Sequence, residues 1–325
     1  MSLTIPGLHH VTVVAGDPQR NLDFYAGVLG LRLIKRTVNF DAPDVYHLYY
    51  GDDLGRPGTI ITFFPFPGAA RGRRGAGQAT TVAFSIPAGA LDYWTNRLKG
   101  HGLTLERPET RLDGAALRFV DHDGLQIELV AGSGRDDRPG CAAGPVPVEH
   151  AIRGFDRVTL SVRDPEPTAR FLTRTLGLRV VDADGDRVRY AAAAGGPGTL
   201  VDVVAVPDAA PGVVAAGTVH HIAWRTPDDE QEKAWQRKLR GLGYDVTDVR
   251  DRQYFHSIYF NEPGGVLFEI ATDVPGFAVD ESPDALGTAL KLPPWLEPQR
   301  PALERALPPL TAPTATADTK EALTS

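Results

Sequence analysis

The chain has 325 residues, of which 42% are hydrophobic and 23% charged, with a formal net charge of −7. This composition predicts a globular protein large enough for about two domains, and the mild negative charge with scattered arginines excludes an evident nucleic-acid-binding face. No stretch approaches the roughly 18 apolar residues of a membrane span, and no signal pattern opens the chain, so we expect a cytoplasmic protein without a membrane role. The lone Cys141 excludes an internal disulfide framework.

The first predicted element is a strand that begins with two adjacent histidines. The segment 7–14 reads GLHHVTVV, in which His9 and His10 precede an alternating run of β-branched residues. A helix-like stretch, NLDFYAGVLGLRLI, comes next, and short apolar segments separated by turn residues follow it. We therefore expect one strand, one helix and then three strands, a βαβββ module that begins near residue 7.

The same module recurs three more times along the chain. Its later copies open with ATTVAFSIP, GFDRVTLSVRDPE and VHHIAWRTP, near residues 79, 154 and 218. The internal spacing is kept, because Gly102 precedes Glu128 by the same 26 residues as Gly243 precedes Glu269. Repeats of this kind indicate an architecture built from copies of one supersecondary unit.

The order of the modules predicts an α+β fold with two pairs of modules. The expected segments are a first pair in residues 1–134, a linker in 135–153, a second pair in 154–273 and a Pro-rich tail in 274–325. The linker is rich in glycine and proline, and the threonine- and alanine-rich end of the tail has a composition typical of disorder. We expect the four βαβββ modules to form two mixed-sheet, half-open barrels.

Only the outer two modules carry histidines at the start of their first strand. The residues at this place in modules one to four are His9-His10, Thr80-Thr81, Asp156-Arg157 and His220-His221. The closing strands differ as well, and our alignment places there Thr62-Phe63, Glu128, Asp202-Val203 and Glu269. Modules one and four together thus supply two histidine pairs and one carboxylate. Glu128 has no histidines in its module and is interpreted as a relic or as a solvated or hydrogen-bonded carboxylate.

Strand geometry selects one histidine from each pair. Because side chains alternate between the two faces of a strand, His10, His221 and Glu269 are expected to face away from the helices, and His9 and His220 toward them. Two imidazoles and a carboxylate can hold a divalent ion and leave positions for substrate or O₂, a set that suits Fe(II) first and Mn(II) next. A single histidine at a strand start is more often structural, but its recurrence in two repeats favours a metal site shared by modules one and four.

The sequence resembles the vicinal oxygen chelate superfamily of glyoxalases and extradiol dioxygenases, and within it ring-cleaving dioxygenases of the hydroquinone 1,2-dioxygenase type. The resemblance extends from residue 7 to about residue 310 and rests on GLHHVT, YYGDDLGRPGTIITFFPFPG, TVHHIAW, DRQYFHSIYFNEPGGVLFEIATD, PGFAVDE and LGTALKLPPWLE. It implies metal ligands at the second histidine of each pair and at the glutamate of the last strand, which are His10, His221 and Glu269. It also implies residues near the substrate, which are His9, Thr12, His220, Arg252 and Tyr259.

Two parts of this resemblance need comment. A position near the substrate for His9 and His220 conflicts with strict alternation, and a twist or a bulge at the strand start would reconcile the two. Catechol-cleaving enzymes of two-domain form usually place ligands at the starts of modules three and four, and Asp156-Arg157 excludes that arrangement here. Modules one and four must therefore meet across one sheet.

The function implied is that of a non-haem Fe(II)-dependent dioxygenase that inserts O₂ into a para-dihydroxylated ring next to a hydroxylated carbon. His220, His9 or Tyr259 would serve as acid or base, and Arg252 would stabilise an anion or position the tyrosine, although Arg252 and Tyr259 also fit a cross-strand stacking pair. The alternatives are a glyoxalase-like lyase or isomerase and a non-catalytic aromatic-binding resistance protein. The sequence leaves open the ring substituents, iron against manganese, a homo-oligomer and the role of His256.

Overall fold

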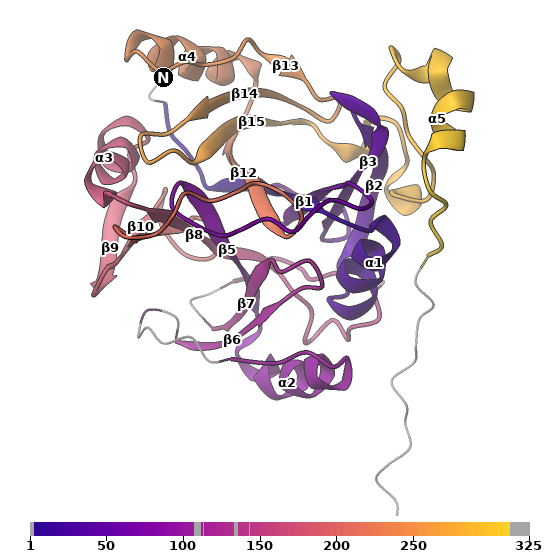
Figure 1. Cartoon of the computed structure of the whole chain (residues 1–325), viewed down its shortest axis with the longest axis horizontal. Helices are drawn as coiled ribbons and strands as arrows, with labels where there is room; N and C mark the ends of the chain where they lie inside the picture. The colour runs from indigo at the N-terminus through magenta and orange to yellow at the C-terminus, as the bar shows by residue number, and fades with distance from the viewer. Residues whose placement is uncertain (1–2, 107–111, 113, 133–135, 143, 313–325) are drawn as a thin grey trace, which may run out of the picture.

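Two mixed β-sheets form the framework of the molecule (Figure 1). The computed structural model describes residues 3–106, 112, 114–132, 136–142 and 144–312. The eight-stranded sheet has the order β13-β14-β15-β12-β1-β4-β3-β2, and the seven-stranded sheet has the order β6-β7-β5-β8-β11-β10-β9. The expected α+β class with two mixed sheets is confirmed, and modules one and four share one sheet.

The eight-stranded sheet curls into a half-barrel. Its strands are β1 (Leu8–Ala15), β2 (Arg32–Asn39), β3 (Ala42–Gly51), β4 (Ile60–Pro65), β12 (Thr218–Thr226), β13 (Arg250–Asp251), β14 (Phe255–Asn261) and β15 (Leu267–Pro275). The strands of the other sheet are β5 (Gln78–Ile86), β6 (Ala115–Val120), β7 (Gln126–Ala131), β8 (Gly154–Val162), β9 (Arg179–Asp184), β10 (Arg187–Ala191) and β11 (Leu200–Ala205).

Each module carries one helix after its first strand, as its sequence predicts. The helices are α1 (Pro18–Leu22), α2 (Leu91–Gly100), α3 (Pro165–Arg170) and α4 (Asp229–Gly241), and α5 (Arg300–Ala306) lies in the tail. In modules one and three the helix continues as a π-helical turn, η1 (Asp23–Val28) and η4 (Phe171–Thr175). No helix in the described part of the chain is long and apolar enough to cross a membrane.

A seam between the first strands of two modules joins the halves of each sheet. β1 pairs antiparallel with β12, and β5 pairs antiparallel with β8. Within a module the first strand pairs parallel with the last, as β1 does with β4 and β12 with β15. The chain halves are therefore interleaved, because each sheet takes one module from each half.

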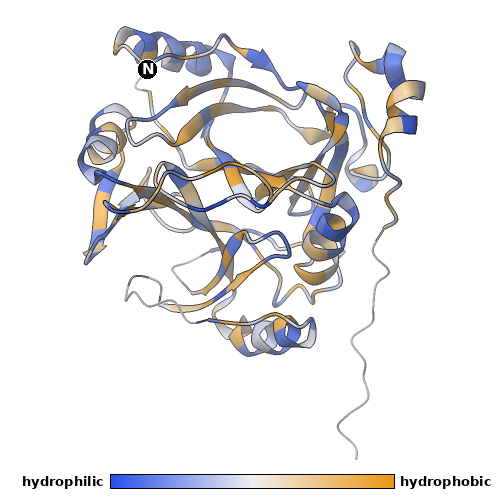
Figure 2. Cartoon of the chain, in the orientation of Figure 1, coloured by the Kyte–Doolittle hydropathy of each residue, from blue (hydrophilic) through white to orange (hydrophobic). Residues whose placement is uncertain are grey.

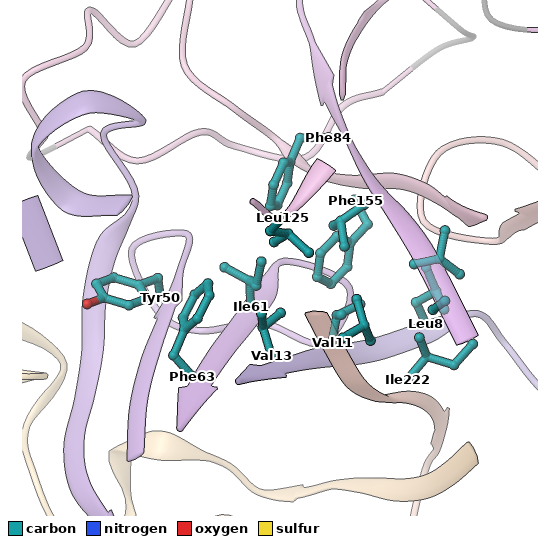
Figure 3. Close-up of a cluster of buried hydrophobic side chains, with 14 of the residues drawn as sticks. Leu8, Val11, Val13, Tyr50, Ile61, Phe63, Phe84, Leu125, Phe155 and Ile222 are labelled. Carbon is teal, nitrogen blue, oxygen red and sulfur yellow. The ribbon is translucent and has the colours of Figure 1, made fainter. Parts of the chain in front are cut away.

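The main hydrophobic core lies between the two sheets and beneath the helices. Figure 3 shows Val11 and Val13 of β1 and Ile222 of β12 gathered with Phe84 and Phe155 of the other sheet, and all are buried in one cluster. Figure 2 shows hydrophobic residues along the strands of both sheets and hydrophilic residues over much of α4. The alternate side chains of β1 thus point to the opposite, concave face of the half-barrel.

In both seams the strand register shifts at the two-residue segments that were compared between modules, such as His9-His10. In β1, Leu8 and His10 pair with the successive residues Trp224 and Ala223, so His9 is the extra residue. In β12, His220 is extra in the same way, and the corresponding shifts in the other sheet fall at Thr80 and Asp156. An extra residue on one strand is the geometry of a β-bulge, which re-aims side chains locally. All four modules therefore share one bulge, which corrects the expected position of His9 and His220 on the helix side.

The tail after β15 packs back onto the half-barrel. Phe277 and Leu286 are buried in a cluster with Tyr254 and Phe255, and Leu303 of α5 joins the main core. The fully buried ammonium of Lys35 pairs with Asp280 and Glu281 of this segment. The tail is thus part of the fold as far as residue 312, and the end for which disorder was expected lies, from residue 313, outside the described residues.

Candidate metal centre

Three side chains from three adjacent strands meet on the concave face of the half-barrel. His10 Nε2 lies 3.2 Å and His221 Nε2 lies 2.8 Å from Glu269 Oε2, and the two Nε2 atoms lie 3.4 Å apart. The side chains come from β1, β12 and β15, and Glu269 is fully buried. The structure thus brings together the three residues that the sequence selected as ligands, although 211 residues separate the two histidines.

The first histidine of each pair is hydrogen-bonded to the second. His9 Nδ1 lies 2.9 Å from His10 Nδ1, and His220 Nδ1 lies 2.7 Å from His221 Nδ1. If the second histidine donates its Nδ1 proton to the first, its Nε2 atom keeps a lone pair directed at Glu269, the tautomer that metal binding requires. The bulge makes these contacts possible, because it turns neighbouring rings toward one side of the strand.

The donor set fits a divalent metal ion. Within the described residues, His10, His221 and Glu269 are a group whose ligand atoms lie within 4.8 Å of one another, and all three are buried. Among the residues that the structure describes, Glu269 Oε2 has no hydrogen-bond donor, while the other carboxylate oxygen accepts a hydrogen bond from Ser257. Burial raises the pKa of Glu269, but the adjacent His10 and His221 hold it well below its usual range. A buried, ionised carboxylate between two imidazoles is a ligand set for a cation.

Burial favours the neutral form of three of the four histidines, His9, His220 and His221. The pKa of His9 is held well below its usual value by burial and by the adjacent His10. The pKa of His220 falls to about 4 through burial and the adjacent His221, and burial lowers that of His221 as well. Neutral imidazoles can accept a proton in a hydrogen bond or bind a metal through a lone pair.

A pocket of about 410 Å³ opens in front of these ligands. Its volume lies within the range of about 300–1,000 Å³ that is typical of small-molecule sites. Much of its wall is aromatic or apolar, contributed by Phe40, Tyr49, Phe64, Phe66, Phe255 and Leu267. The polar part of the wall includes His10, Thr12, His47, His220, His221, Arg252 and Tyr259. Such a wall suits a flat ring with a few polar substituents.

Two further residues singled out in the sequence, Arg252 and Tyr259, lie on one flank of the pocket. Arg252 Nε donates to the Tyr259 hydroxyl over 3.1 Å, and the guanidinium lies 5.3 Å from the centre of the tyrosine ring. Arg252 also forms an ion pair of 3.0 Å with Asp41, which belongs to the connection between β2 and β3. Burial and the charge of Glu269 raise the pKa of Tyr259, so its phenol keeps its proton at neutral pH.

Of the other predicted site residues, Thr12 lines the pocket and His9 does not. Thr12 is fully buried beside the ligands, and its hydroxyl lies 2.9 Å from that of Thr62. His9 lies behind His10, with its ring 5.2 Å from that of Phe255. His256 contacts the carboxylate of Asp229 on α4 at 2.7 Å and is not part of the pocket wall.

The sequence did not reveal two pocket residues, His47 and Tyr49 of β3. His47 Nε2 lies 2.8 Å from Thr62 Oγ1, and the Tyr49 hydroxyl lies 2.8 Å from His47 Nδ1. Thr62 itself was aligned with Glu269, and the register confirms that alignment. Thr62 pairs with the residue two after His10, as Glu269 pairs with the residue two after His221. The alternation of β3 was the one available signal for His47 and Tyr49.

In the other sheet an arginine faces the carboxylates. Arg157, at the place of His10, donates to Glu128 over 2.6 Å and to Asp156 over 2.7 Å, and its Nε atom lies 3.3 Å from Asp202. All four side chains are fully buried. Glu128, interpreted from the sequence as a relic or a solvated or hydrogen-bonded carboxylate, is hydrogen-bonded to Arg157 and Arg118.

Three aromatic residues of β12 and β14 divide between the pocket and the core. Phe255 lines the pocket, with its ring 5.0 Å from that of His10. Trp224 and Phe260 belong to the main core on the opposite face of the sheet. The bulges and the alternation of strand faces thus decide which aromatic rings a ligand can meet.

Comparisons with known proteins agree with this architecture. The model of the Glyoxalase/Bleomycin resistance protein/Dioxygenase superfamily matches residues 7–129 and 154–270. A Bacillus subtilis (strain 168) protein named "Putative ring-cleaving dioxygenase MhqO" is 46% identical over 93% of this chain and 96% of its own length. The "Chlorohydroquinone/hydroquinone 1,2-dioxygenase" of Sphingobium indicum is 37% identical over 93% of this chain and 96% of its own.

Two solved structures show the same fold. A crystal structure from Bacillus subtilis subsp. subtilis str. 168, named "putative dioxygenase", superposes with a TM-score of 0.90 at 45% identity. It covers 96% of this chain and 99% of its own. Glyoxalase I from Zea mays superposes with a TM-score of 0.60 at 17% identity, over 82% of this chain and 92% of its own, which is a likeness of fold alone.

Proposed function

The chain belongs to the Glyoxalase/Bleomycin resistance protein/Dioxygenase superfamily, and from this premise we propose that it is an Fe(II)-dependent dioxygenase that cleaves a hydroquinone-type ring. The observation that carries the proposal is the meeting of His10, His221 and Glu269 at the base of a largely aromatic pocket. The names of two relatives, a ring-cleaving dioxygenase and a hydroquinone 1,2-dioxygenase, support the reaction class.

The metal site would hold Fe(II), with Mn(II) as the second choice. Two imidazoles and one carboxylate leave several positions free for other ligands, as in other non-haem iron oxygenases. Iron in this site would supply the electron transfer between the aromatic ring and O₂. His9 and His220 would hold the ligand histidines in the tautomer that binds metal, and Ser257 would fix the orientation of Glu269.

The remaining pocket residues would bind and orient the substrate. Phe64 and Phe255 would contact its ring, and Thr12 is in position for a hydrogen bond to an oxygen beside the ligands. Tyr259 keeps its proton, so we assign it the role of a hydrogen-bond donor rather than a base. Arg252 would position that tyrosine and favour negative charge on the substrate. His220, which is neutral and lines the pocket, accepts from His221 at Nδ1 in this tautomer and would therefore present its Nε2 proton to the substrate as a donor.

The position of Thr62 argues against glyoxalase chemistry. A glyoxalase-like lyase or isomerase on this scaffold would normally have a fourth protein ligand on the closing strand of module one. That position, the register equivalent of Glu269, holds Thr62, whose hydroxyl already contacts Thr12 and His47. A protein that only binds aromatic compounds would need the pocket but not a set of three buried ligands.

The proposed function is tested by anaerobic reconstitution with Fe(II), followed by oxygen-electrode traces. The substrates are hydroquinone, catechol and the adduct of methylglyoxal with glutathione. We expect oxygen uptake with hydroquinone, together with loss of the aromatic absorption band. Uptake with catechol alone would contradict the para preference, and isomerisation of the adduct without oxygen uptake would replace the proposal with glyoxalase chemistry.

A matched pair of variants ties the activity to the site. His221→Ala removes a proposed ligand, whereas His256→Ala removes a histidine outside the pocket wall. We expect the first to lose bound iron and oxygen uptake, and the second to keep both. Full activity in His221→Ala would contradict the assignment of the site.

A further inference from the structure

A second hydrogen-bonded chain lies in the pocket wall formed by module one. The Tyr49 hydroxyl lies 2.8 Å from His47 Nδ1, and His47 Nε2 lies 2.8 Å from Thr62 Oγ1. Thr62 Oγ1 lies in turn 2.9 Å from Thr12 Oγ1. Tyr49, His47 and Thr12 all line the pocket, so the hydrogen-bonded chain begins at the pocket wall at Tyr49 and ends at the wall beside the ligands, at Thr12.

This chain is the counterpart of the contacts that support Glu269 in module four. Tyr49 and Thr62 are cross-strand partners in β3 and β4, as Tyr259 and Glu269 are in β14 and β15. The serine two residues before Tyr259 donates to Glu269. His47, two residues before Tyr49, bonds Thr62 in the same way. Module one, which lacks a metal ligand at this position, therefore still has a hydrogen-bonding side chain in the supporting position, a histidine in place of the serine.

One direction of the hydrogens along the hydrogen-bonded chain satisfies all four groups and ends at the ligands. In this direction the Tyr49 hydroxyl donates to His47 Nδ1, its hydrogen-bond partner in the described part of the protein. A neutral His47 then carries its proton on Nε2 and donates to Thr62. Thr62 passes its own hydrogen to Thr12, whose hydroxyl hydrogen is left to point into the pocket. Burial keeps Tyr49 and His47 uncharged and so preserves this order.

We propose that His47 is a positioning residue that acts through Thr62 to present the Thr12 hydroxyl as a hydrogen-bond donor to a phenol oxygen of the substrate. The inference rests on the proposed function, because it assigns the substrate an oxygen beside His10. Without His47, Thr62 can donate elsewhere and Thr12 can turn its hydrogen toward Thr62. The pocket would then offer an oxygen lone pair to the electron-rich substrate oxygen, which is a repulsive contact.

The sharpest test compares two substitutions of Thr62. Thr62→Val has nearly the same shape but breaks the chain, whereas Thr62→Ser keeps the hydroxyl. The probe is para-nitrophenol, titrated without oxygen into the Fe(II)-loaded protein and followed by the visible absorption of its phenolate. We expect Thr62→Val to bind the probe about tenfold more weakly, the effect of one lost hydrogen bond to a charged oxygen, and Thr62→Ser to bind close to the wild type.

Substitutions of His47 itself give a second test. His47→Phe keeps a flat ring beside Phe64 and removes both nitrogens, whereas the amide of His47→Gln can still donate to Thr62. We expect the first variant to raise the KM for hydroquinone about tenfold with little change in kcat, and the second to restore most of the loss. The pH profile of kcat/KM should keep its shape, because a positioning residue exchanges no proton with the substrate.

The outcomes separate this inference from the proposed function. Equal probe binding by wild type and Thr62→Val, at equal iron content, overturns the inference. Equal weakening in Thr62→Ser overturns it too, because packing and not the hydroxyl is then responsible. If one limb of the pH profile of kcat/KM disappears in His47→Phe alone, His47 acts as a base and the positioning role is overturned. Absent probe binding in the iron-loaded wild type overturns the inference, whereas normal probe binding without oxygen uptake on hydroquinone overturns the proposed function alone.

Discussion

Arg157 Nη2 lies 2.6 Å from Glu128 Oε2 in an ion pair with no exposed surface. Arg157 holds the place in the seven-stranded sheet that His10 holds in the half-barrel, and Glu128 holds the place of Glu269. In the seven-stranded sheet the guanidinium of Arg157 thus lies beside the buried carboxylates. In the half-barrel the buried carboxylate of Glu269 lies beside two imidazoles, a set that fits a metal ion. Both sheets have kept a buried negative group at the same register position.

Arg157→Met should destabilise the protein strongly. The variant removes the fully buried guanidinium that Glu128, Asp156 and Asp202 share, and breaking a buried ion pair costs about 3–5 kcal/mol of unfolding free energy. Urea unfolding followed by circular dichroism measures the loss. Arg170→Met is the control, because the ion pair of Arg170 with Glu166 is exposed and should cost less than about 1 kcal/mol. Similar midpoints for the two variants would contradict this account.

Glu232→Gln should make stability less dependent on pH. Glu232 of α4 is fully buried, neither carboxylate oxygen has a hydrogen-bond partner in the described structure, and burial with the nearby Asp229 raises its pKa to about 8. A raised pKa in the folded state means that the folded form holds the proton more tightly. The stabilisation is complete below the unfolded pKa near 4.5 and is lost as the pH rises through about 8.

The comparison is between wild type and Glu232→Gln at about pH 5 and about pH 9. At the higher pH we expect the glutamine variant to be more stable, on the order of 3 kcal/mol in unfolding free energy, and at the lower pH the two should be close. Glu230→Gln, an exposed change on the same helix, serves as the control and should follow the wild type. Parallel curves for Glu232→Gln and wild type would refute a protonated, buried Glu232.

His9→Ala should weaken metal binding without abolishing it. The variant removes the group bonded to His10 Nδ1, and loss of such a supporting hydrogen bond typically costs 10- to 100-fold in metal affinity. His10→Ala should reduce retained iron to a small fraction of the wild-type content. Competition with a chelator measures both. The control is His150→Ala, because the His150 ring stacks on Tyr93 away from the site, and this variant should retain metal like the wild type. Retention of metal by His9→Ala at the wild-type level would contradict a supporting role for its contact with His10.

Phe277→Ala should loosen both the fold and the metal centre. Phe277 is buried, with ring centres 5.1 Å from Tyr49 and 5.0 Å from Tyr254, so its truncation should cost about 3–5 kcal/mol. It also packs near Phe255, which contacts His10, so we expect faster loss of iron to a chelator. The exposed Val279, two residues after Phe277, offers a control, since Val279→Ala should change neither property. Unchanged iron loss in Phe277→Ala would separate the tail from the site.

Repetition made the central part of the site predictable from the sequence. Comparing four copies of one module showed which positions had changed, and strand alternation then selected His10, His221 and Glu269. Alternation failed at His9 and His220, because a bulge is a local insertion that leaves no periodic signal in a single strand. The same bulge at Thr80 and Asp156 shows that it belongs to the module and not to the histidines.

The parts that the sequence did not reveal depend on contacts between distant segments. His47 has no counterpart histidine in module four, where Ser257 stands, so comparison of modules could not single it out. The tail showed a proline-rich composition and two segments that resemble the dioxygenases, PGFAVDE and LGTALKLPPWLE, but no repeat of the module that would place them in the fold. Its apolar residues Phe277 and Leu286 are nevertheless buried in a cluster with Phe255, whose ring lies 5.0 Å from that of His10, and burial of that kind depends on the shape of the half-barrel.

The pairing of β1 with β12 has a consequence for synthesis of the protein. During translation His10 emerges 211 residues before His221 and still longer before Glu269. The nascent chain therefore passes through most of its length with a single member of the ligand set, and it cannot bind a metal ion at the complete centre. Metal binding by all three ligands must follow closure of the seam, so a bound metal ion would report on completed assembly and cannot guide the early stages of folding.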